Sequence, residues 1–389
     1  MSRSANVKAD LPASFLVAAE RYATWLRKHA LPYWATSGRD VRFGGSIERV
    51  EADGRIDPDA PLRLRVQARQ LFVYASAVQY AWFESAPEYV DALWNFMERH
   101  GRHATRDGYI HTLIWPDGDR DQRLDLYDHA FFLLAAALHH RVTQATDSRT
   151  RADGIVAMLD ERLAAVSGGW HEGDYAAPYR RQNPHMHLFE AFMAWYETDN
   201  DPAWLDRATQ MYALFDQHFF DREHGLVLEY FGADWSRPED VMAQVAEPGH
   251  LLEWVWLLDW YQRLSNVDTE AAQRQLFATA MEHGRDGHLV IDELNSDASP
   301  RTRSKRLWPM TEFIKAACVR GLRGDVPAFD AAAAAIDTLF ERFLVAEPAG
   351  AYIDRLDDNN VVTDARAPAS SLYHLTAALI EVERVLAQD

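Results

Sequence analysis

Apolar residues recur at the three- and four-residue spacing of an amphipathic helix along almost the whole chain. Short and long connections alternate between these stretches, and short connections are typical of antiparallel neighbouring helices. We therefore expect helices that come in pairs. The twelve predicted segments are 11–30, 61–84, 87–103, 124–143, 147–166, 184–198, 202–219, 248–265, 268–285, 304–322, 326–345 and 368–387.

Each long connection contains a similar fragment. It begins at or near a glycine, alternates apolar and polar residues, and reaches a turn rich in Asp, Asn or Gly, which is typical of a short β-hairpin. The six fragments are 44–54, 108–118, 169–175, 225–234, 287–297 and 350–360.

Six repeats of helix, hairpin loop and helix predict one repeating architecture, so we expect a single domain over residues 1–389. The simplest closed form is an all-α (α/α)6 barrel with short β-hairpins in the long loops at one end. The even-numbered segments of this series are richer in apolar and aromatic residues, as in FEAFMAWY and LLEWVWLLDWY, and should form the inner ring. The long loops then surround the N-termini of the inner helices, where a pocket is expected.

The amino-acid composition narrows the classes of function and partner that are expected. The net charge of −19 disfavours contact with a phosphate backbone, so no nucleic-acid partner is expected. Cys318 is the only cysteine, which excludes an internal disulfide and predicts a buried thiol. No apolar run resembles a signal peptide or a membrane span, so a cytoplasmic protein without a membrane partner is expected. The 13 Trp and 15 Tyr residues suit stacking on sugars, and they suit an ordinary core equally well.

Polar residues interrupt the apolar pattern near the starts of the inner helices. Arg69 lies among apolar residues of segment 61–84, so we expect its side chain to point inward, with Arg65 on the same face. Segment 124–143 begins with Tyr127, Asp128 and His129 in its first turn. Asp128 has the alternative role of a helix cap.

The next two inner helices share a His-x-x-Glu spacing. Asn183 followed by Pro184 predicts an N-cap and a first-turn proline, with His187 one turn later. His250 and Glu253 repeat the spacing at the start of segment 248–265. Such a spacing can indicate a metal, but its order is the reverse of the Glu-x-x-His motif of di-iron bundles. We therefore expect no metal.

The last two inner helices add Trp308, Glu312 and His374. A single histidine on an apolar face is usually a core residue, whereas three at the same end of equivalent helices indicate a shared site. Imidazoles exchange protons near neutral pH, and Arg69 could hold a developing enediolate oxygen. Glu253 or Glu312 could orient an imidazole. The sequence has no phosphate loop, dinucleotide fingerprint or nucleophile elbow, which favours acid–base chemistry on a small polar molecule.

With these residues identified, the chain resembles the N-acylglucosamine 2-epimerase superfamily, and within it the bacterial D-mannose isomerases. The resemblance extends from the Arg69 helix to His374 and rests on five motifs in order and spacing. These are ARQLFVYA, NPHMHLFEA, EPGHLLEWVWLL, LWPMTE and LYHLTAALIE. The family has the (α/α)6 barrel that the repeats predict.

The resemblance also implies roles for individual residues. His250 and His374 match the acid/base pair that works through a cis-enediol, and Glu253 and Glu312 match residues that support the imidazoles and contact hydroxyl groups. The resemblance implies that an open-chain sugar is bound without metal or nicotinamide cofactor. The further sugar-binding residues that it implies are Asn183, His187 and Arg69, with Trp308 and Trp256 as the wall of the site.

The resemblance leaves the reaction open. Interconversion of D-mannose and D-fructose is favoured, and the alternative is 2-epimerisation of mannose/glucose or of an N-acylhexosamine. Ala369 stands where cellobiose 2-epimerases carry a Trp, which argues for a monosaccharide rather than a disaccharide substrate. Two other classes stay open: a glycoside hydrolase with a carboxylate pair, and a sugar-binding protein without activity. We expect a monomer or a homodimer.

Overall fold

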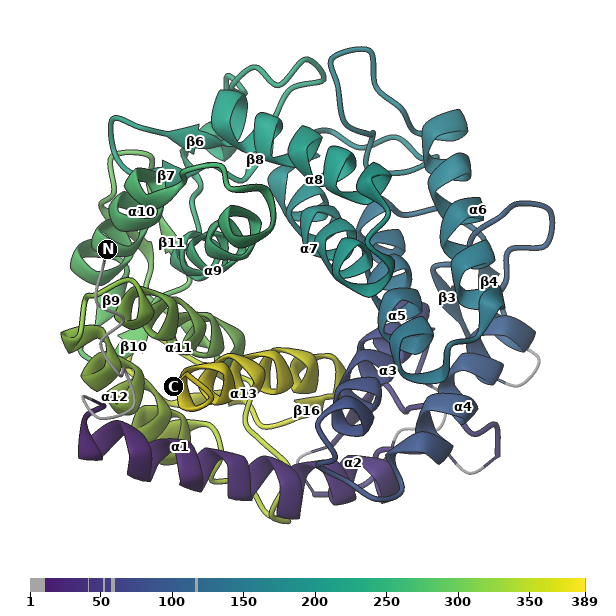
Figure 1. The fold of residues 1–389 in the computed structure, drawn as a ribbon, viewed down its shortest axis with the longest axis horizontal. Coiled ribbons are helices and arrows are strands. Elements are labelled where there is room, and N and C mark those ends of the chain that lie inside the picture. The colour runs from purple at the N-terminus through teal and green to yellow at the C-terminus, as the bar shows by residue number, and fades with distance from the viewer. Residues whose placement is uncertain (1–10, 41, 52, 57–59, 116–117, 389) are drawn as a thin grey trace.

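The structure, a computed structural model, describes residues 11–40, 42–51, 53–56, 60–115 and 118–388. Within this part of the chain, six helices form an inner ring and the remaining helices surround them (Figure 1). The inner helices are α3 (Leu64–Gln79), α5 (Leu126–Thr143), α7 (Gln182–Asp199), α9 (Pro248–Ser265), α11 (Leu307–Leu322) and α13 (Leu372–Leu386).

Each inner helix packs against the next one in the chain, and α13 closes the ring by packing against α3. Helices α4, α6, α8, α10 and α12 each lie against the inner helix that precedes them in the chain, and α1 lies against α12 and α13. These contacts confirm the predicted (α/α)6 barrel. The outer helices are α1 (Ala13–Trp25), α2 (Leu31–Thr36), α4 (Ala86–Phe96), α6 (Thr146–Arg162), α8 (Pro202–Leu214), α10 (Glu270–His283) and α12 (Pro327–Arg342).

The inner helices lie inside because they are apolar on nearly all sides. In α9, Pro248 opens the helix without needing a hydrogen-bond acceptor for its nitrogen, and the run LLEWVWLLD that follows is buried. Asn266 ends the helix in the left-handed conformation, as Asn200 does for α7. Lone Cys318 lies on α11 and is buried, which confirms that prediction.

Several predicted helix ends differ from the structure. Segment 11–30 continues to Thr36, because α1 passes through a π-turn, η2 (Leu26–Ala30), into α2. Similar π-turns, η3 (Met97–Gly101) and η4 (Phe215–Phe219), extend α4 and α8. Segments 61–84 and 368–387 start later than predicted, since their first residues belong to strands that pair across loops. The two 3-10 turns are η5 (Val241–Gln244) and η6 (Ala369–Ser371).

The predicted hairpins are only partly confirmed. Fragment 108–118 contains one strand of a local hairpin, β3 with β4, but fragment 225–234 divides between two different partners. Fragment 169–175 contains isolated bridges and no strand among the described residues. The strands are β1 (Arg49–Val50), β2 (Leu62–Arg63), β3 (Thr112–Leu113), β4 (Arg120–Asp121), β5 (Arg180–Arg181), β6 (Phe220–Asp221), β7 (Leu226–Val227), β8 (Tyr230–Phe231), β9 (Arg285–Asp286), β10 (Leu289–Val290), β11 (Glu293–Leu294), β12 (Pro300–Thr302), β13 (Lys305–Arg306), β14 (Arg355–Leu356), β15 (Val362–Asp364) and β16 (Ala367–Pro368).

Four strand pairs join one long loop to the next rather than closing a hairpin. In each pair, one strand leads directly into an inner helix or its first turn, and the partner comes from the loop of a neighbouring repeat. The alternating pattern identified one strand of each pair but not its partner, because the backbone groups of neighbouring loops are brought together only when the barrel closes. The antiparallel pairs are β2 with β3, β5 with β8, β13 with β14, and β16 with β1.

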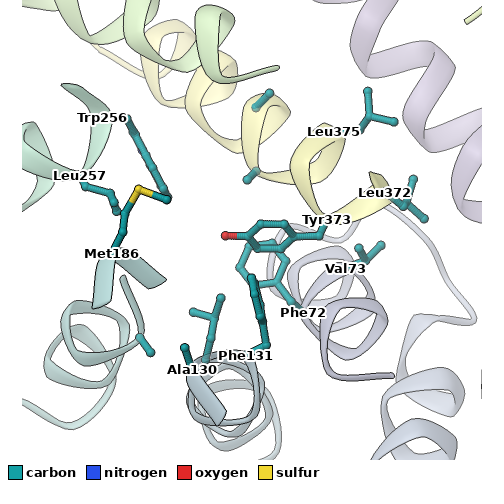
Figure 2. Packing of buried hydrophobic residues seen from close by; sticks show 14 of the residues in the cluster. Phe72, Val73, Ala130, Phe131, Met186, Trp256, Leu257, Leu372, Tyr373 and Leu375 are labelled. Carbon is teal, nitrogen blue, oxygen red and sulfur yellow. The ribbon is translucent and has the colours of Figure 1, made fainter. Parts of the chain in front are cut away.

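The inner ring is layered along its axis. The sixth residues of the inner helices are Arg69, Phe131, His187, Glu253, Glu312 and Ala377, and the ninth residues are Phe72, Leu134, Glu190, Trp256, Lys315 and Ile380. A helix rises 1.5 Å per residue, so successive layers lie about 4.5 Å apart in depth. Figure 2 shows Phe72, Phe131 and Tyr373 from three different inner helices packed against one another. In the described part of the chain, no helix is both long and apolar enough to cross a bilayer.

Candidate active site

A cavity of about 300 Å³ opens at the end of the barrel where the inner helices begin. Its wall combines residues from the first two turns of all six inner helices with residues of the long loops. This position is the one that the repeat pattern predicts. The helical residues of the wall are Arg69, Tyr127, Asn183, His187, His250, Glu253, Trp308 and His374.

The cavity brings together seven of the nine predicted site residues. Glu312 does not line it, because its side chain is fully buried behind His374. Trp256 was expected in the wall and is not there, which is a correction. It is the ninth residue of α9, one layer below Glu253, and its indole Nε1 donates to Oε2 of Glu381. It lines a separate cavity of about 210 Å³ instead.

His374 is held by Glu312. Nδ1 of His374 lies 2.9 Å from Oε1 of Glu312, and both side chains are buried. Burial lowers the pKa of His374 to about 3, although the Glu312 carboxylate acts in the opposite direction. His374 is therefore neutral near pH 7. With its Nδ1 proton directed at Glu312, its Nε2 atom carries a free lone pair and can act as a base.

His250 has the opposite protonation state. Its Nδ1 lies 2.7 Å from Oε1 of Glu229, which β7 and β8 flank in the preceding loop. Burial by itself lowers the pKa of His250, but the charges of Glu229 and Glu247 outweigh it and raise the pKa to about 9. His250 is therefore an imidazolium near pH 7 and can act as an acid.

Glu229 is the functional residue that the sequence reasoning missed. We expected Glu253 beside His250, or Glu312, to orient an imidazole, and Glu312 does so for His374. Neither oxygen of Glu253 has a hydrogen-bond partner among the described residues. The signal for Glu229 was an acidic residue inside the apolar run LVLEYF, where its side chain is buried. A buried carboxylate in such a run needs a polar or charged partner.

Asn183 was predicted as the N-cap of its helix, and this is wrong. Helix α7 begins at Gln182 with Arg181 as the N-cap, so Asn183 lies inside the first turn. Its Nδ2 lies 3.3 Å from Nε2 of His250, while its Oδ1 has no partner among the described residues. Rotation of this amide would present Oδ1 to a protonated Nε2. Asn183 can therefore stabilise His250 both before and after it loses a proton.

Trp308 lies between the two histidines. The centroid of its ring is 5.0 Å from that of His250 and 5.6 Å from that of His374. Gly249 permits this approach, since a Cβ at Gly249 would lie 2.5 Å from Cη2 of the Trp308 ring. The two imidazoles therefore line one cavity beside a single flat apolar ring, which suits the face of a sugar.

Arg69 is a buried cation that points into the cavity. Its Nη2 donates to the hydroxyl of Tyr127 at 2.6 Å, and its guanidinium lies 4.1 Å from the centre of the Phe131 ring. Among the described residues it has no carboxylate partner, and its Nε has no acceptor. A buried guanidinium without a counter-ion favours an oxygen that becomes negative during a reaction.

Glu253 is a second group that lacks a protein partner. It is 1% exposed, and burial together with the charge of Glu312 raises its pKa to about 8. At neutral pH Glu253 is therefore mainly a neutral carboxylic acid, which can donate a hydrogen bond to a hydroxyl or carbonyl oxygen in the cavity.

A hydrogen-bond chain leads from the cavity wall at His187 into the interior of the barrel. Nδ1 of His187 lies 3.1 Å from Oε2 of Glu190, and the hydroxyl of Tyr373 donates to the other oxygen of Glu190. Burial lowers the pKa of His187 to about 4. His187 is therefore neutral, and its Nε2 is free to accept a hydrogen bond from a substrate hydroxyl.

Asp128 is neither a cap nor part of the cavity. Asp125 caps α5 by accepting a hydrogen bond from the backbone nitrogen of Asp128. The Asp128 carboxylate binds Nη1 of Arg65 and Nδ1 of His111, both at 2.7 Å. Arg65 therefore forms an ion pair that joins α3 to α5, and it does not line the cavity.

Ala369 also lies outside the cavity wall. It belongs to η6 and is fully buried, and its backbone groups bind Gln70 and Glu48. Its neighbours Pro368 and Ser370 line the cavity instead. Because Ala369 does not face the cavity, its small side chain does not determine the size of the sugar that fits there. Selectivity for a monosaccharide therefore stays a prediction.

Among the described residues, three groups of side chains lie close enough to hold a cation, with their candidate ligand atoms within 4.8 Å of one another. Each group contains one imidazole whose Nδ1 already lies within 3.1 Å of a carboxylate oxygen. A metal at those Nδ1 atoms would have to replace the hydrogen bond that orients the ring. The groups are His187, Glu190 and Glu253; Glu229, Glu247 and His250; and Glu253, Glu312 and His374.

A family profile described as N-acylglucosamine 2-epimerase (GlcNAc 2-epimerase) matches residues 45–378, a span that contains the whole cavity wall. The chain belongs to the N-acylglucosamine 2-epimerase family. This membership confirms the resemblance found in the five motifs. It also explains why the polar residues of the inner helices converge on one cavity.

Individual relatives in this family differ in name. A mannose-6-phosphate isomerase of Rhizobium meliloti (strain 1021) is 32% identical over 380 residues, which are 94% of this chain and 96% of the relative. A D-mannose isomerase of Thermobifida fusca is 30% identical over 57% of this chain and 60% of the relative. The structure of a cellobiose 2-epimerase from Bacillus thermoamylovorans B4167 superposes with a TM-score of 0.86 at 17% identity. This superposition covers 95% of this chain and 100% of that one, and it shows a shared fold.

Proposed function

We propose that this protein is a sugar isomerase that interconverts D-mannose and D-fructose by proton transfer through a cis-enediol. The observation that carries the proposal is the pairing of a neutral His374 with a protonated His250 beside Trp308, in one cavity. A base and an acid with separated pKa values are what the enolisation of an aldose requires. The names of two relatives in the family, a D-mannose isomerase and a mannose-6-phosphate isomerase, support the same reaction class.

The proposed reaction has two proton exchanges. Nε2 of His374 takes the proton from C2 of the open-chain aldose while His250 donates a proton to O1, which gives the cis-enediol. His250 then takes the proton from O2 as His374 returns its proton to C1, which gives the ketose. The protons balance, and both histidines return to their initial states.

The other groups bind and polarise the sugar. Arg69 stabilises negative charge on an enediol oxygen, and neutral Glu253 donates a hydrogen bond to a hydroxyl or carbonyl group. Asn183 and His187 bind further hydroxyl groups, and Trp308 covers the sugar face. We expect the enzyme to work in the cytoplasm, as a monomer or a homodimer, on a monosaccharide.

The second candidate is a sugar 2-epimerase acting on mannose/glucose or on an N-acylhexosamine. In that reaction one histidine removes the C2 proton and the other returns a proton to the opposite face of C2. The positions of His250 and His374 in one cavity beside Trp308 are compatible with it, and cellobiose 2-epimerases also match this chain.

Incubation with D-mannose in D₂O tests both candidates. An isomerase places deuterium on C1 of fructose, whereas an epimerase places it on C2 of glucose. A hydrolase or a sugar-binding protein leaves free mannose unchanged. Complete absence of label over many reversible turnovers would rule out proton transfer through these histidines.

A further inference from the structure

Lys315 is a fully buried lysine that the reaction described above does not use. It is the ninth residue of α11, so it belongs to the layer below the one that contains Glu253 and Glu312. An ammonium group without contact to water is strongly unfavourable unless other charges or dipoles stabilise it. The contacts of Lys315 therefore show what this charge does.

Two contacts define the position of the ammonium group. Nζ lies 2.5 Å from Oε2 of Glu312, and it lies 3.6 Å from the centre of the Trp256 ring. The other oxygen of Glu312, Oε1, is the one that binds Nδ1 of His374. One carboxylate thus bridges the buried lysine and the proposed base.

Other ionisable groups also face this bridge. Glu253 comes from α9, Glu190 from α7, and His374 with Tyr373 from α13, while Tyr22 approaches from the outer helix α1. Of the three nearby carboxylates, Glu312 is the one in direct contact with the ammonium group. The two oxygens of Glu253 have no hydrogen-bond partner among the described residues. Lys315 therefore pairs directly with Glu312 and not with Glu190 or Glu253.

We propose that Lys315 is a positioning residue, which keeps Glu312 ionised so that Glu312 accepts the Nδ1 proton of His374 and leaves Nε2 free to take the substrate proton. This inference rests on the proposed function only for the identity of the substrate. The protonation states of Glu312 and His374 that it describes are those of the protein without substrate.

The expected state of Glu312 without the Lys315 ammonium group shows why this charge matters. Burial alone would raise the pKa of Glu312, but Lys315 and the hydrogen bond from His374 lower it below its usual range. Without the ammonium group, Glu312 would become a neutral acid and could donate its own proton to Nδ1. His374 would then carry its proton on Nε2, where it cannot accept one from C2.

The test uses Lys315→Met, which keeps the length of the side chain and removes its charge. We expect kcat to fall at least tenfold near pH 7, with a much smaller change in KM. A new acidic limb should appear in the pH profile of kcat, because activity now requires Glu312 to ionise at a raised pKa. The double variant Lys315→Met/Glu312→Gln should have a kcat only slightly below that of Glu312→Gln alone, since both changes act through the same carboxylate.

Lys305 provides the matched control. It is also fully buried and ion-paired, with Asp286 at 2.8 Å, but it lies on β13 and does not line the cavity. Lys305→Met should lower thermal stability and leave the shape of the pH profile of kcat unchanged. If both variants change that profile alike, the effect is a general consequence of losing a buried charge, and the proposal is wrong.

A readout that needs no substrate separates this proposal from the proposed function. In ¹⁵N NMR of histidine-labelled wild-type protein, His374 should carry its proton on Nδ1, and Lys315→Met should shift it towards Nε2. An Nε2-protonated His374 in the wild type, or a His374 that stays protonated on Nδ1 in a folded Lys315→Met variant, overturns the proposal. If the variant does not fold, the wild-type spectrum decides. Failure to convert mannose would contradict the proposed function and leave this spectroscopic test intact.

Discussion

Glu229 places its Oε1 atom 2.7 Å from Nδ1 of His250, and each of the two side chains is only 4% exposed. This contact sets the protonation state of one of the two histidines that face the cavity. His374 has a carboxylate at the same atom and the opposite protonation state. The difference arises because two acids, Glu229 and Glu247, act on His250, whereas burial dominates at His374.

The first prediction concerns pH dependence. With a pKa of about 9, His250 is protonated below pH 9 and loses its proton above it, so activity should decline on the alkaline side. Glu229→Gln removes one of the charges that raise this pKa, and it should move the alkaline limb at least about one pH unit lower. Profiles of kcat/KM against pH measure this shift. Glu172→Gln is the control, because Glu172 is a buried loop carboxylate that binds Arg181 rather than an imidazole.

The second prediction concerns the two histidines as a unit. His250→Asn and His374→Ala should each lower kcat by about 10²–10⁴-fold, the usual contribution of a general acid or base. The double variant should be little worse than either single variant, since both act in the same proton transfers. Circular dichroism shows whether the variants are folded. Near-normal rates in both folded single variants would contradict the proposed mechanism.

The third prediction concerns the approach of α9 to Trp308. In Gly249→Ala, the added methyl group would lie 2.5 Å from the indole and force it away from the histidines. A displacement of about 1 Å can cost as much as 100-fold in rate, so we expect kcat/KM to fall at least tenfold. Gly154→Ala on the outer helix α6 is the control, because the nearest atom of another side chain is at 3.3 Å. Equal activity of the two variants would show that Trp308 does not need its observed position.

The fourth prediction concerns metals. The mechanism uses side chains of the protein alone, and the Nδ1 atom of each imidazole in the three His–carboxylate groups is directed at a carboxylate. Activity should therefore survive exhaustive treatment with EDTA and dialysis without added cations. Loss of activity that Mn²⁺ or Co²⁺ restores would contradict the metal-free mechanism.

The fifth prediction concerns substrate size. The cavity measures about 300 Å³, at the small end of the usual range for ligand pockets. Free hexoses should therefore be converted with a much higher kcat/KM than β-1,4-linked disaccharides. Initial rates with D-mannose and cellobiose, measured on the same enzyme preparation, test this. Similar values for the two sugars would show that the loops open far enough to admit a second ring.

Much of the architecture follows from local patterns. Segment 248–265 matches α9 residue for residue, because Pro248 and Asn266 mark its ends with backbone preferences that depend on the residues themselves. The repeated loop fragments predicted the closed ring. The partners of the strands could not be predicted in the same way, since β16 pairs with β1, more than 300 residues away in the chain.

The same division holds for the candidate site. Position along a helix predicted that Arg69, His187, His250 and His374 face one end of the barrel, because every inner helix begins at that end. Position along a helix did not predict that Trp256 lies one layer below the cavity wall. That depth depends on how far along the barrel axis α9 packs.

The sequence by itself determined the repeating helices, the ring that they close, and the end of the ring at which imidazoles, carboxylates and a guanidinium gather. Only the tertiary structure decided which carboxylate binds which imidazole. Glu229 reaches His250 from a loop and Glu312 reaches His374 from a neighbouring helix. Protonation states depend on burial and on charges within a few ångströms, and these distances exist only after the barrel has closed.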